Sequence, residues 1–415
     1  MALDKLHPVL TATLETFGHE GRLKGTERVI TGIQPPAAGF GPRYFLQGYS
    51  RRAFLRMNAN TYLGLNTDPR VIAAAEEAAR RFGAGPGAVR FISGTFQPHV
   101  DLEQHLAAFH GRQTCMVFSA AYAAVMGILP ALLTEHTLVV SDALNHNCII
   151  NAIRLARPGY RAVYGHCDTS QLQDILAQHR GQAQRAVVVT DGVFSMRGDC
   201  APLPEIVTLC ERYYDDYPEG ILTVVDDSHG VGAFGAHGRG TEEHTGAQAD
   251  IVIATLGKAL GVNGGYVVAS QTVIDYFRET APLYIYSNPI SPAEAAAALQ
   301  ALHILASDEG VALVRQVGDL ARTLRAGLQH LGYETLPGEH PIVPLLVRDT
   351  GRTRALVEQL FARDILATGL AYPVVPRGDE EIRFQLSAAH TPQDIACVLE
   401  ALPSPEPGSP GLRPR

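Results

Sequence analysis

Hydrophobic and polar positions follow a regular pattern through the middle of the chain, from about residue 114 to residue 254. Short apolar runs rich in β-branched residues recur there, and stretches with apolar residues at helical spacing separate them. Continuous apolar strands that alternate with helices are typical of a mainly parallel sheet covered on both faces. The predicted strands are 114–118, 138–141, 162–164, 186–190, 222–225 and 250–254, and the predicted helices between them are about 145–156, 169–179 and 203–217.

The segments on either side of this region have different patterns. An amphipathic stretch at 10–17 and a Gly/Pro-rich passage at 34–42 predict a helical arm and an extended connector. After residue 290, two helices lead into alternating strands and helices, which predicts a smaller α+β domain. The elements predicted outside the central region are helices at 69–82, about 94–106, 291–306, 350–363 and 391–402, a further helix that reaches residue 331, and strands at 342–347 and 382–386.

These patterns predict an α/β protein with four parts. We expect an N-terminal arm at 1–55, a large domain at 56–290 and a small C-terminal domain at 291–402. The last residues, 403–415, are dense in Pro, Gly and Ser, which predicts a disordered tail.

Composition excludes several classes of protein. The 415 residues are 46% hydrophobic and 18% charged, as in soluble globular proteins. The formal net charge is −8 and no long basic run is present, so nucleic acid is not expected as a partner. No apolar stretch approaches the roughly 20 residues of a membrane span, and the N-terminus lacks the pattern of a signal peptide. Six cysteines without CxxC spacing argue against a zinc site or a disulfide framework, and we expect a cytoplasmic protein.

Polar residues follow four of the predicted strands. Each group alone is explained by a helix cap or a polar loop, but ligands of parallel α/β sheets lie outside the carboxyl ends of the strands. Four such groups on one sheet therefore predict a single functional crevice. The groups are Asp142 to His146, Asp191 to Met196, Asp226 to Gly230, and Thr255 to Lys258.

Lys258 is the most informative of these residues. It follows the apolar run 251–254 and is surrounded by small residues. A lysine amine is costly to bury as a cation, and one with a lowered pKa can form a Schiff base with a carbonyl. The alternative is a solvated lysine at a strand end, and this stretch alone does not decide between the two.

The other residue types favour an aldehyde cofactor. The chain has no HExxH, no GxSxG and no paired glutamates, and His146 and His229 have no third metal ligand at convincing spacing. The Gly-rich segment 83–90 lacks the pattern of a nucleotide P-loop. Pyridoxal phosphate requires a lysine, a carboxylate for its ring nitrogen, a flat side chain over the ring and donors for its phosphate.

Residues 55 to 400 resemble the α-oxoamine synthases, which are pyridoxal-phosphate enzymes of fold type I. Within that group the chain is most similar to the 2-amino-3-ketobutyrate CoA ligases (glycine C-acetyltransferases). The resemblance implies a large domain with a mainly parallel seven-stranded sheet. The stretches that carry it are 89–95, 141–146, 190–196, 225–229, 255–261, 372–376, 382–383 and 387–391.

The resemblance also implies roles for individual residues. Lys258 would form the Schiff base and transfer the proton at the substrate α-carbon, and Asp226 would pair with the pyridinium nitrogen. His146 would stack on the ring, while Ser195 and His229 would bond the phenolic oxygen.

Further residues would bind phosphate and substrate. Thr255 and the backbone amides of Ala121 and Tyr122 would hold the cofactor phosphate, which Ser287 of a second subunit would also reach. The active unit would therefore be a homodimer. Asn60 and Arg383 would hold the substrate carboxylate.

The implied reaction joins an amino acid to an acyl thioester and releases CoA and usually carbon dioxide. Its product is an α-amino ketone or a β-keto amino acid. Four positions depart from the pattern of the ligases, namely Thr61, Val125, Arg197 and Pro289. They leave the substrates open: glycine or a small L-amino acid as acceptor, and acyl-CoA or a carrier-protein thioester as donor.

Two other functions are compatible with some of these residues. An aminotransferase or aldolase would use the same Lys258 and Asp226, but the segments 94–99 and 142–146 argue against it. A structural subunit of a heterodimeric synthase would lack the lysine that this chain keeps.

Overall fold

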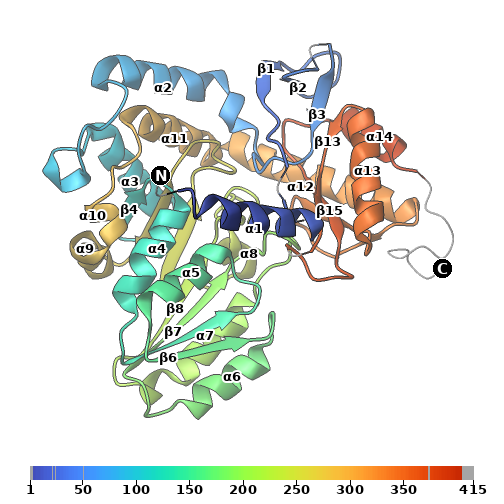
Figure 1. Ribbon diagram of the computed structural model, residues 1–415. Coiled ribbons are helices and arrows are strands. Elements are labelled where there is room, and N and C mark those ends of the chain that lie inside the picture. The colour runs from blue at the N-terminus through green and yellow to red at the C-terminus, as the bar shows by residue number, and fades with distance from the viewer. Residues whose placement is uncertain (1–2, 21, 24, 50, 373, 404–415) are drawn as a thin grey trace. The chain divides into compact units, whose positions relative to one another are not determined.

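The computed structural model describes residues 3–20, 22–23, 25–49, 51–372 and 374–403, which form two compact units (Figure 1). The smaller unit comprises Met1–Ala59, Leu320–Pro337 and Ile342–Arg415. The larger unit comprises Asn60–Asp319 together with Gly338–Pro341.

The larger unit contains the predicted α/β sheet. Its seven strands have the order β4-β10-β9-β8-β7-β5-β6. The pairs β5·β6, β5·β7, β7·β8 and β8·β9 are parallel, and only β10 runs antiparallel to both of its neighbours. The mainly parallel sheet of fold type I is thereby confirmed. The strands are β4 (Thr114–Phe118), β5 (Thr137–Asp142), β6 (Tyr160–Tyr164), β7 (Arg185–Asp191), β8 (Ile221–Asp226), β9 (Ile251–Thr255) and β10 (Gly265–Ala269).

Helices cover both faces of this sheet. Val187 and Val189 of β7 pack in a core with α4 (Ala121–Leu132), α5 (Asn147–Ala156) and α9 (Gln271–Thr280), whereas Ala186 and Val188 pack with α6 (Thr169–Gln178) and α7 (Leu203–Arg212). Burial on both sides explains why these strands are continuous apolar runs. The other helices of this unit are α2 (Pro69–Phe82), α3 (Gln97–Phe109), α8 (Thr241–Thr245), α10 (Pro282–Ile285), α11 (Pro292–Leu305) and the short η1 (Leu65–Thr67), η2 (Arg90–Ile92) and η3 (Tyr214–Asp216).

The smaller unit is built from both ends of the chain. Two four-stranded sheets have the orders β1-β2-β3-β13 and β11-β12-β15-β14. Arg43 Nη2 and Asp394 Oδ1 form an ion pair at 2.7 Å, and the backbone N–H of Gln385 donates to Met57 O at 2.9 Å, so N-terminal and C-terminal segments share one core. The strands are β1 (Ile30–Gln34), β2 (Arg43–Leu46), β3 (Ala53–Arg56), β11 (Glu334–Thr335), β12 (Ile342–Leu346), β13 (Ile365–Leu366), β14 (Thr368–Leu370) and β15 (Glu381–Gln385), and the helices are α1 (His7–His19), α13 (Thr350–Ala362) and α14 (Pro392–Ala401).

The compact units divide the chain at places that differ from the sequence-based domain boundaries. The division falls within α12 (Asp308–His330) rather than before the two long helices, because α11 packs against α2 and α3 of the larger unit. The arm expected at 1–55 belongs to the smaller unit. Of the tail expected at 403–415, only Pro403 is among the described residues.

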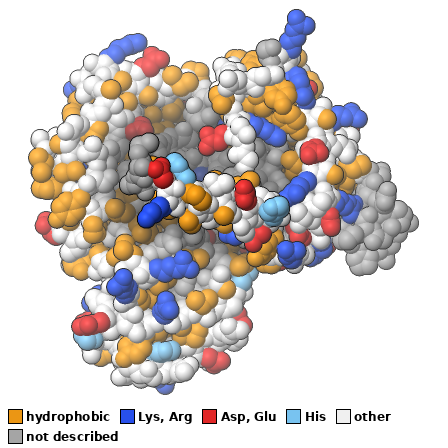
Figure 2. Space-filling view, in the orientation of Figure 1, with side chains coloured by type: hydrophobic (Ala, Val, Ile, Leu, Met, Phe, Trp, Pro, Cys, Tyr) orange, Lys and Arg blue, Asp and Glu red, His pale blue; other side chains and the backbone are white. Residues whose placement is uncertain are grey.

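On the face that Figure 2 shows, acidic and basic side chains lie interspersed among hydrophobic ones. Within the described part of the chain, no single helix is long and apolar enough to cross a membrane, although the bent pair α11 and α12 passes that test together.

Candidate active site

A cavity of about 250 Å³ lies in the larger unit, at the ends of β7, β8 and β9 and at the start of α4. Seven of the eleven predicted site residues line it, so most of the predicted crevice exists as one space. Its lining residues are Ala120, Ala121, Tyr122, His146, Cys148, Asp191, Val193, Asp226, Ser228, His229, Thr255 and Lys258.

The start of α4 offers backbone donors to this cavity. The first N–H groups of a helix have no partner within the helix, and Ala120, the N-cap, supplies no side-chain cap. A Cβ on Gly265 would lie 2.2 Å from the backbone nitrogen of Ala121, so β10 can approach the helix start only because residue 265 is glycine. An uncapped helix N-terminus of this kind favours an anion such as a phosphate.

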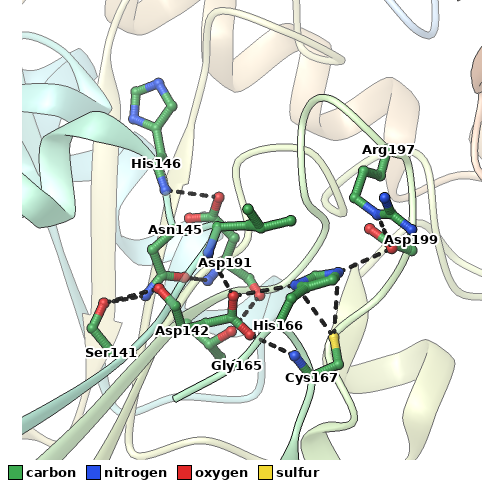
Figure 3. Close-up of polar contacts among 12 residues, drawn as sticks. Ser141, Asp142, Asn145, His146, Gly165, His166, Cys167, Asp191, Arg197 and Asp199 are labelled. Carbon is green, nitrogen blue, oxygen red and sulfur yellow. Dashed lines mark hydrogen bonds and ion pairs between the residues drawn. The ribbon is translucent and has the colours of Figure 1, made fainter. Parts of the chain in front are cut away.

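A hydrogen-bonded loop between β5 and α5 carries His146 (Figure 3). Asp142 accepts the backbone N–H of Leu144 at 2.8 Å, which shapes the loop from inside. Asn145 Nδ2 donates to Ser141 Oγ at 2.9 Å, and its Oδ1 accepts the N–H of Asp191 at 2.8 Å. The loop is therefore tied to the neighbouring strand β7.

The same network places His146 at the cavity. Its backbone N–H donates to Asp191 Oδ2 at 3.1 Å, and its ring nitrogen Nδ1 accepts the N–H of Cys148 at 3.3 Å, where His146 caps α5. Burial lowers the pKa of the imidazole; the charge of Asp226 opposes that shift and the charge of Lys258 adds to it. The ring is therefore neutral at pH 7.

Two carboxylates stand side by side at the ends of β7 and β8, because Asp191 and Asp226 are paired residues of these parallel strands. Asp226 Oδ1 accepts the N–H of Ser228 at 3.1 Å. Burial, and then the neighbouring charge of Asp226, raises the pKa of Asp191 well above its ordinary value. Within the described residues, Asp191 Oδ1 and Ser228 Oγ are buried without a hydrogen-bond partner, so the cavity has polar atoms that a bound molecule can satisfy.

Thr255, Lys258 and His229 also line the cavity. Thr255 Oγ1 donates to Gly264 O at 3.1 Å and accepts the N–H of Gly257 at 3.0 Å, which orders the turn before Lys258. His229 Nδ1 lies 2.7 Å from the hydroxyl of Tyr62, so its ring is held from a segment remote in sequence.

Four of the predicted site residues do not belong to the lining of this cavity, as far as the structure describes it. Ser195 lies in the loop after β7, Asn60 begins the larger unit, and Ser287 follows α10. Arg383 lies on β15 in the smaller unit. Their roles remain predictions.

Three lining residues with side chains able to form hydrogen bonds, Cys148, Asp191 and Ser228, were not assigned a role from the sequence. Asp191 and Ser228 stood inside segments that carried the resemblance, so their position after a strand was a usable signal. Cys148 gave no such signal, because its contacts with His146 and Asp226 arise only in the folded chain.

Comparisons with known proteins show the family of the chain. The family model for aminotransferases of class I and II matches residues 52–402. An 8-amino-7-oxononanoate synthase from Thermosipho melanesiensis is 40% identical over 83% of this chain and 86% of its own length. The mitochondrial 2-amino-3-ketobutyrate coenzyme A ligase of Bos taurus is 38% identical over 96% of this chain and 92% of its own length. The chain belongs to the α-oxoamine synthases.

Solved structures support the same assignment. A serine palmitoyltransferase from S. paucimobilis, whose structure contains PLP joined to myriocin, superposes with a TM-score of 0.85 at 27% identity and 96% coverage of both chains. The resemblance, the fold and the enzyme class inferred from the sequence are confirmed, and this α-oxoamine synthase is a pyridoxal-phosphate-dependent acyltransferase. The lysine, carboxylates, neutral imidazole and uncapped helix start of the cavity fit that cofactor.

Proposed function

We propose that this α-oxoamine synthase condenses glycine or another small L-amino acid with an acyl-CoA thioester, giving an amino ketone with loss of carbon dioxide. The observation that supports it best is the meeting of Lys258, Asp226 and His146 in one cavity beside the uncapped start of α4. Pyridoxal phosphate, when bound, supplies an electron sink for the electrons released at the substrate α-carbon.

The residues of the chain then have separate tasks. Lys258 Nζ would hold the cofactor covalently and would accept and return the α-proton. Asp226 would keep the ring nitrogen protonated, because a carboxylate next to it stabilises the cation. His146 would stack on the ring, and as a neutral imidazole it would avoid repulsion between two cations. The free N–H groups of Ala121 and Tyr122 hold the phosphate, with the Thr255 hydroxyl beside them.

The remaining residues are assigned to the phenolic oxygen of the cofactor and to the carboxylate of the substrate. Ser195 and His229 bond the phenolic oxygen, and the contact of His229 with Tyr62 orients its ring for this task. Asn60 and Arg383 hold the substrate carboxylate, where a guanidinium can make two parallel hydrogen bonds.

We also propose that the active unit is a homodimer and that Ser287 reaches the phosphate of the partner subunit's site. Tyr286, next to Ser287, is 81% exposed, and Phe91 and Ile92 of the adjacent η2 are 67% and 58% exposed. Large apolar side chains grouped in this way are typical of a protein interface. All six cysteines are free thiols, which supports the cytoplasm as the proposed location.

The dimer is tested by sedimentation. Tyr286→Glu should dissociate the protein at micromolar concentration and lower its activity, whereas Tyr214→Glu, at an exposed tyrosine on η3, should do neither. A Tyr286→Glu protein that sediments as the wild type does would contradict this interface.

The activity is tested on the purified protein with glycine, alanine and serine, each combined with acyl-CoA esters of increasing length. Release of the free CoA thiol identifies the substrate pair, and a carrier-protein thioester that reacts faster would favour the alternative donor. Borohydride reduction should fix the cofactor on the peptide that contains Lys258. Lys258→Ala should remove the visible absorption and lower turnover at least about 100-fold, whereas Lys5→Ala should change neither. A protein that binds no pyridoxal phosphate and releases no CoA would favour a structural subunit.

A further inference from the structure

Cys148 lies at the floor of the cavity, between two groups that the proposed function assigns to the cofactor. It is the second residue of α5 and only 2% exposed. Its Sγ lies 2.9 Å from His146 Nδ1 and 3.7 Å from Asp226 Oδ2. No other task has been assigned to this thiol.

The contacts fix where the imidazole carries its proton. Nδ1 of His146 accepts the backbone N–H of Cys148 at 3.3 Å, so Nδ1 has no proton of its own. Burial and the nearby carboxylate of Asp226 raise the pKa of the Cys148 thiol, which therefore remains protonated. Its single proton lies between two acceptors, Nδ1 and the Asp226 carboxylate. When the thiol donates to Nδ1 it adds to the backbone N–H there, and the two donors leave the imidazole proton on Nε2.

We propose that Cys148 is a positioning residue that holds His146 in the Nε2–H tautomer and links it to Asp226 below the cofactor site. This inference rests on the proposed function, because it concerns the two groups expected to meet the cofactor ring from its face and at its nitrogen. In a neutral histidine, the hydrogen bond that one ring nitrogen makes determines which of the two nitrogens carries the proton. A fixed neutral ring can lie over a cationic pyridinium without repulsion.

Other charged and polar groups lie near His146, and the Cys148 variants keep all of them. Asp226 lies on β8, Lys258 follows β9, Asp191 ends β7, and Tyr122 of α4 has its ring 6.3 Å from the imidazole. Their charges are unchanged by a substitution at Cys148. A shift in the properties of His146 can then be attributed to the thiol.

The first measurement needs no cofactor. Nitrogen-15 chemical shifts of the histidine side chains in the apoprotein, with His146 assigned by the His146→Gln variant, report its tautomer and its pKa. In Cys148→Ala the backbone N–H of residue 148 still donates to Nδ1, so we expect the Nε2–H tautomer to remain and the pKa to shift upward, because Nδ1 loses the thiol donor. In Cys148→Ser we expect a return toward wild type, because a hydroxyl also donates. Identical nitrogen shifts for His146 in wild type and Cys148→Ala would overturn the inference.

The second measurement follows the bound cofactor. Cys148→Ala should weaken pyridoxal phosphate binding about 3- to 10-fold, as expected for one lost hydrogen bond, and should move the pH midpoint of the cofactor's absorbance. Cys148→Ser should restore both. Cys210→Ala removes a buried thiol from the core between α7 and the sheet and should leave both unchanged.

An unchanged midpoint in Cys148→Ala would also contradict the proposal. If wild type bound no cofactor, the proposed function would fail, whereas the pKa of His146 in the apoprotein would still decide the role of Cys148.

Discussion

His166 lies between two carboxylates, and we expect its removal to destabilise the protein in a pH-dependent way. Its Nδ1 is 3.2 Å from Asp142 Oδ1 and its Nε2 is 3.1 Å from Asp199 Oδ2 (Figure 3). Burial lowers the pKa of the imidazole, but the hydrogen bonds to Asp142 and Asp199 outweigh it and raise the pKa to about 11. The bridging group is therefore an imidazolium that joins the loop after β5 to the loop after β7.

The size of the effect follows from linkage between protonation and folding. A histidine with a pKa near 6.5 when unfolded and about 11 when folded stabilises the protein fully below pH 6.5. That contribution is lost as the pH rises through the folded value, at about 1.4 kcal/mol per pH unit between the two. The ring is 20% exposed and Asp199 is 29% exposed, so solvent reduces the total. We expect His166→Asn to cost about 2–3 kcal/mol at pH 7.

Calorimetry of the apoprotein tests this expectation. His166→Asn should lower Tm by several degrees at pH 6.5, and the difference from wild type should shrink at pH 8 and again at pH 9.5. His105→Asn is the control, since the exposed His105 bonds the backbone oxygen of Asp101 through Nδ1 rather than a carboxylate. A Tm difference that is the same at pH 6.5 and at pH 9.5 would refute the ionic role of His166.

Three further substitutions test the architecture of the larger unit. Asp227→Asn should destabilise the protein more at pH 5 than at pH 8 in thermal melts, because burial raises the pKa of this carboxyl to about 7 and its stabilising neutral form is lost above that pH. Gly265→Ala should weaken pyridoxal phosphate binding, measured by absorbance titration, because the new Cβ would push the start of α4 away, whereas Gly85→Ala has open space and should be neutral. Glu103→Ala should lower stability by about 3–5 kcal/mol in urea unfolding, because it leaves Arg90, bonded at 2.9 and 3.0 Å, as a buried unpaired charge.

The strands of the larger unit could be predicted because burial on two faces leaves a strong signal. The run at 114–118 coincides with β4, and the other five predicted strands begin and end within one or two residues of the observed ones. The helix α4 was not predicted, since it is apolar on most sides and has no amphipathic stripe. β10 was missed because it returns through the glycine-rich turn after Lys258, where a following helix is the more common outcome.

Strands of the smaller unit were harder to predict. β1 is mostly exposed, β13 has only two residues, and β3 pairs with β13 across most of the length of the chain. Short exposed strands have no apolar alternation, and their pairing depends on distant segments. The passage expected as an extended connector, 34–42, lies almost entirely between β1 and β2, and the two strands on either side of it were not predicted.

In the candidate site, too, residues marked by their position after a strand could be predicted, whereas residues marked only by contacts in the folded chain could not. Asp226 and Lys258 could be found because each follows an apolar strand, and parallel strands bring such residues to one edge. Cys148 could not be found in this way, because its contacts depend on how α5 begins and on the strand that carries Asp226. Ser287 stays a prediction for a related reason, since the contact expected of it lies in a second subunit.

The pair of carboxylates at the end of the sheet shows how the fold can assign different tasks to one residue type. Asp191 and Asp226 occupy paired positions on neighbouring strands, where two negative charges repel each other in a buried space. Asp191 is enclosed, and its raised pKa keeps it neutral, with Oδ2 accepting the N–H of His146. A neutral Asp191 positions the loop that carries His146 without competing for a cation. The neighbouring Asp226 can then pair with the protonated ring of the cofactor, so the two strands separate positioning from chemistry.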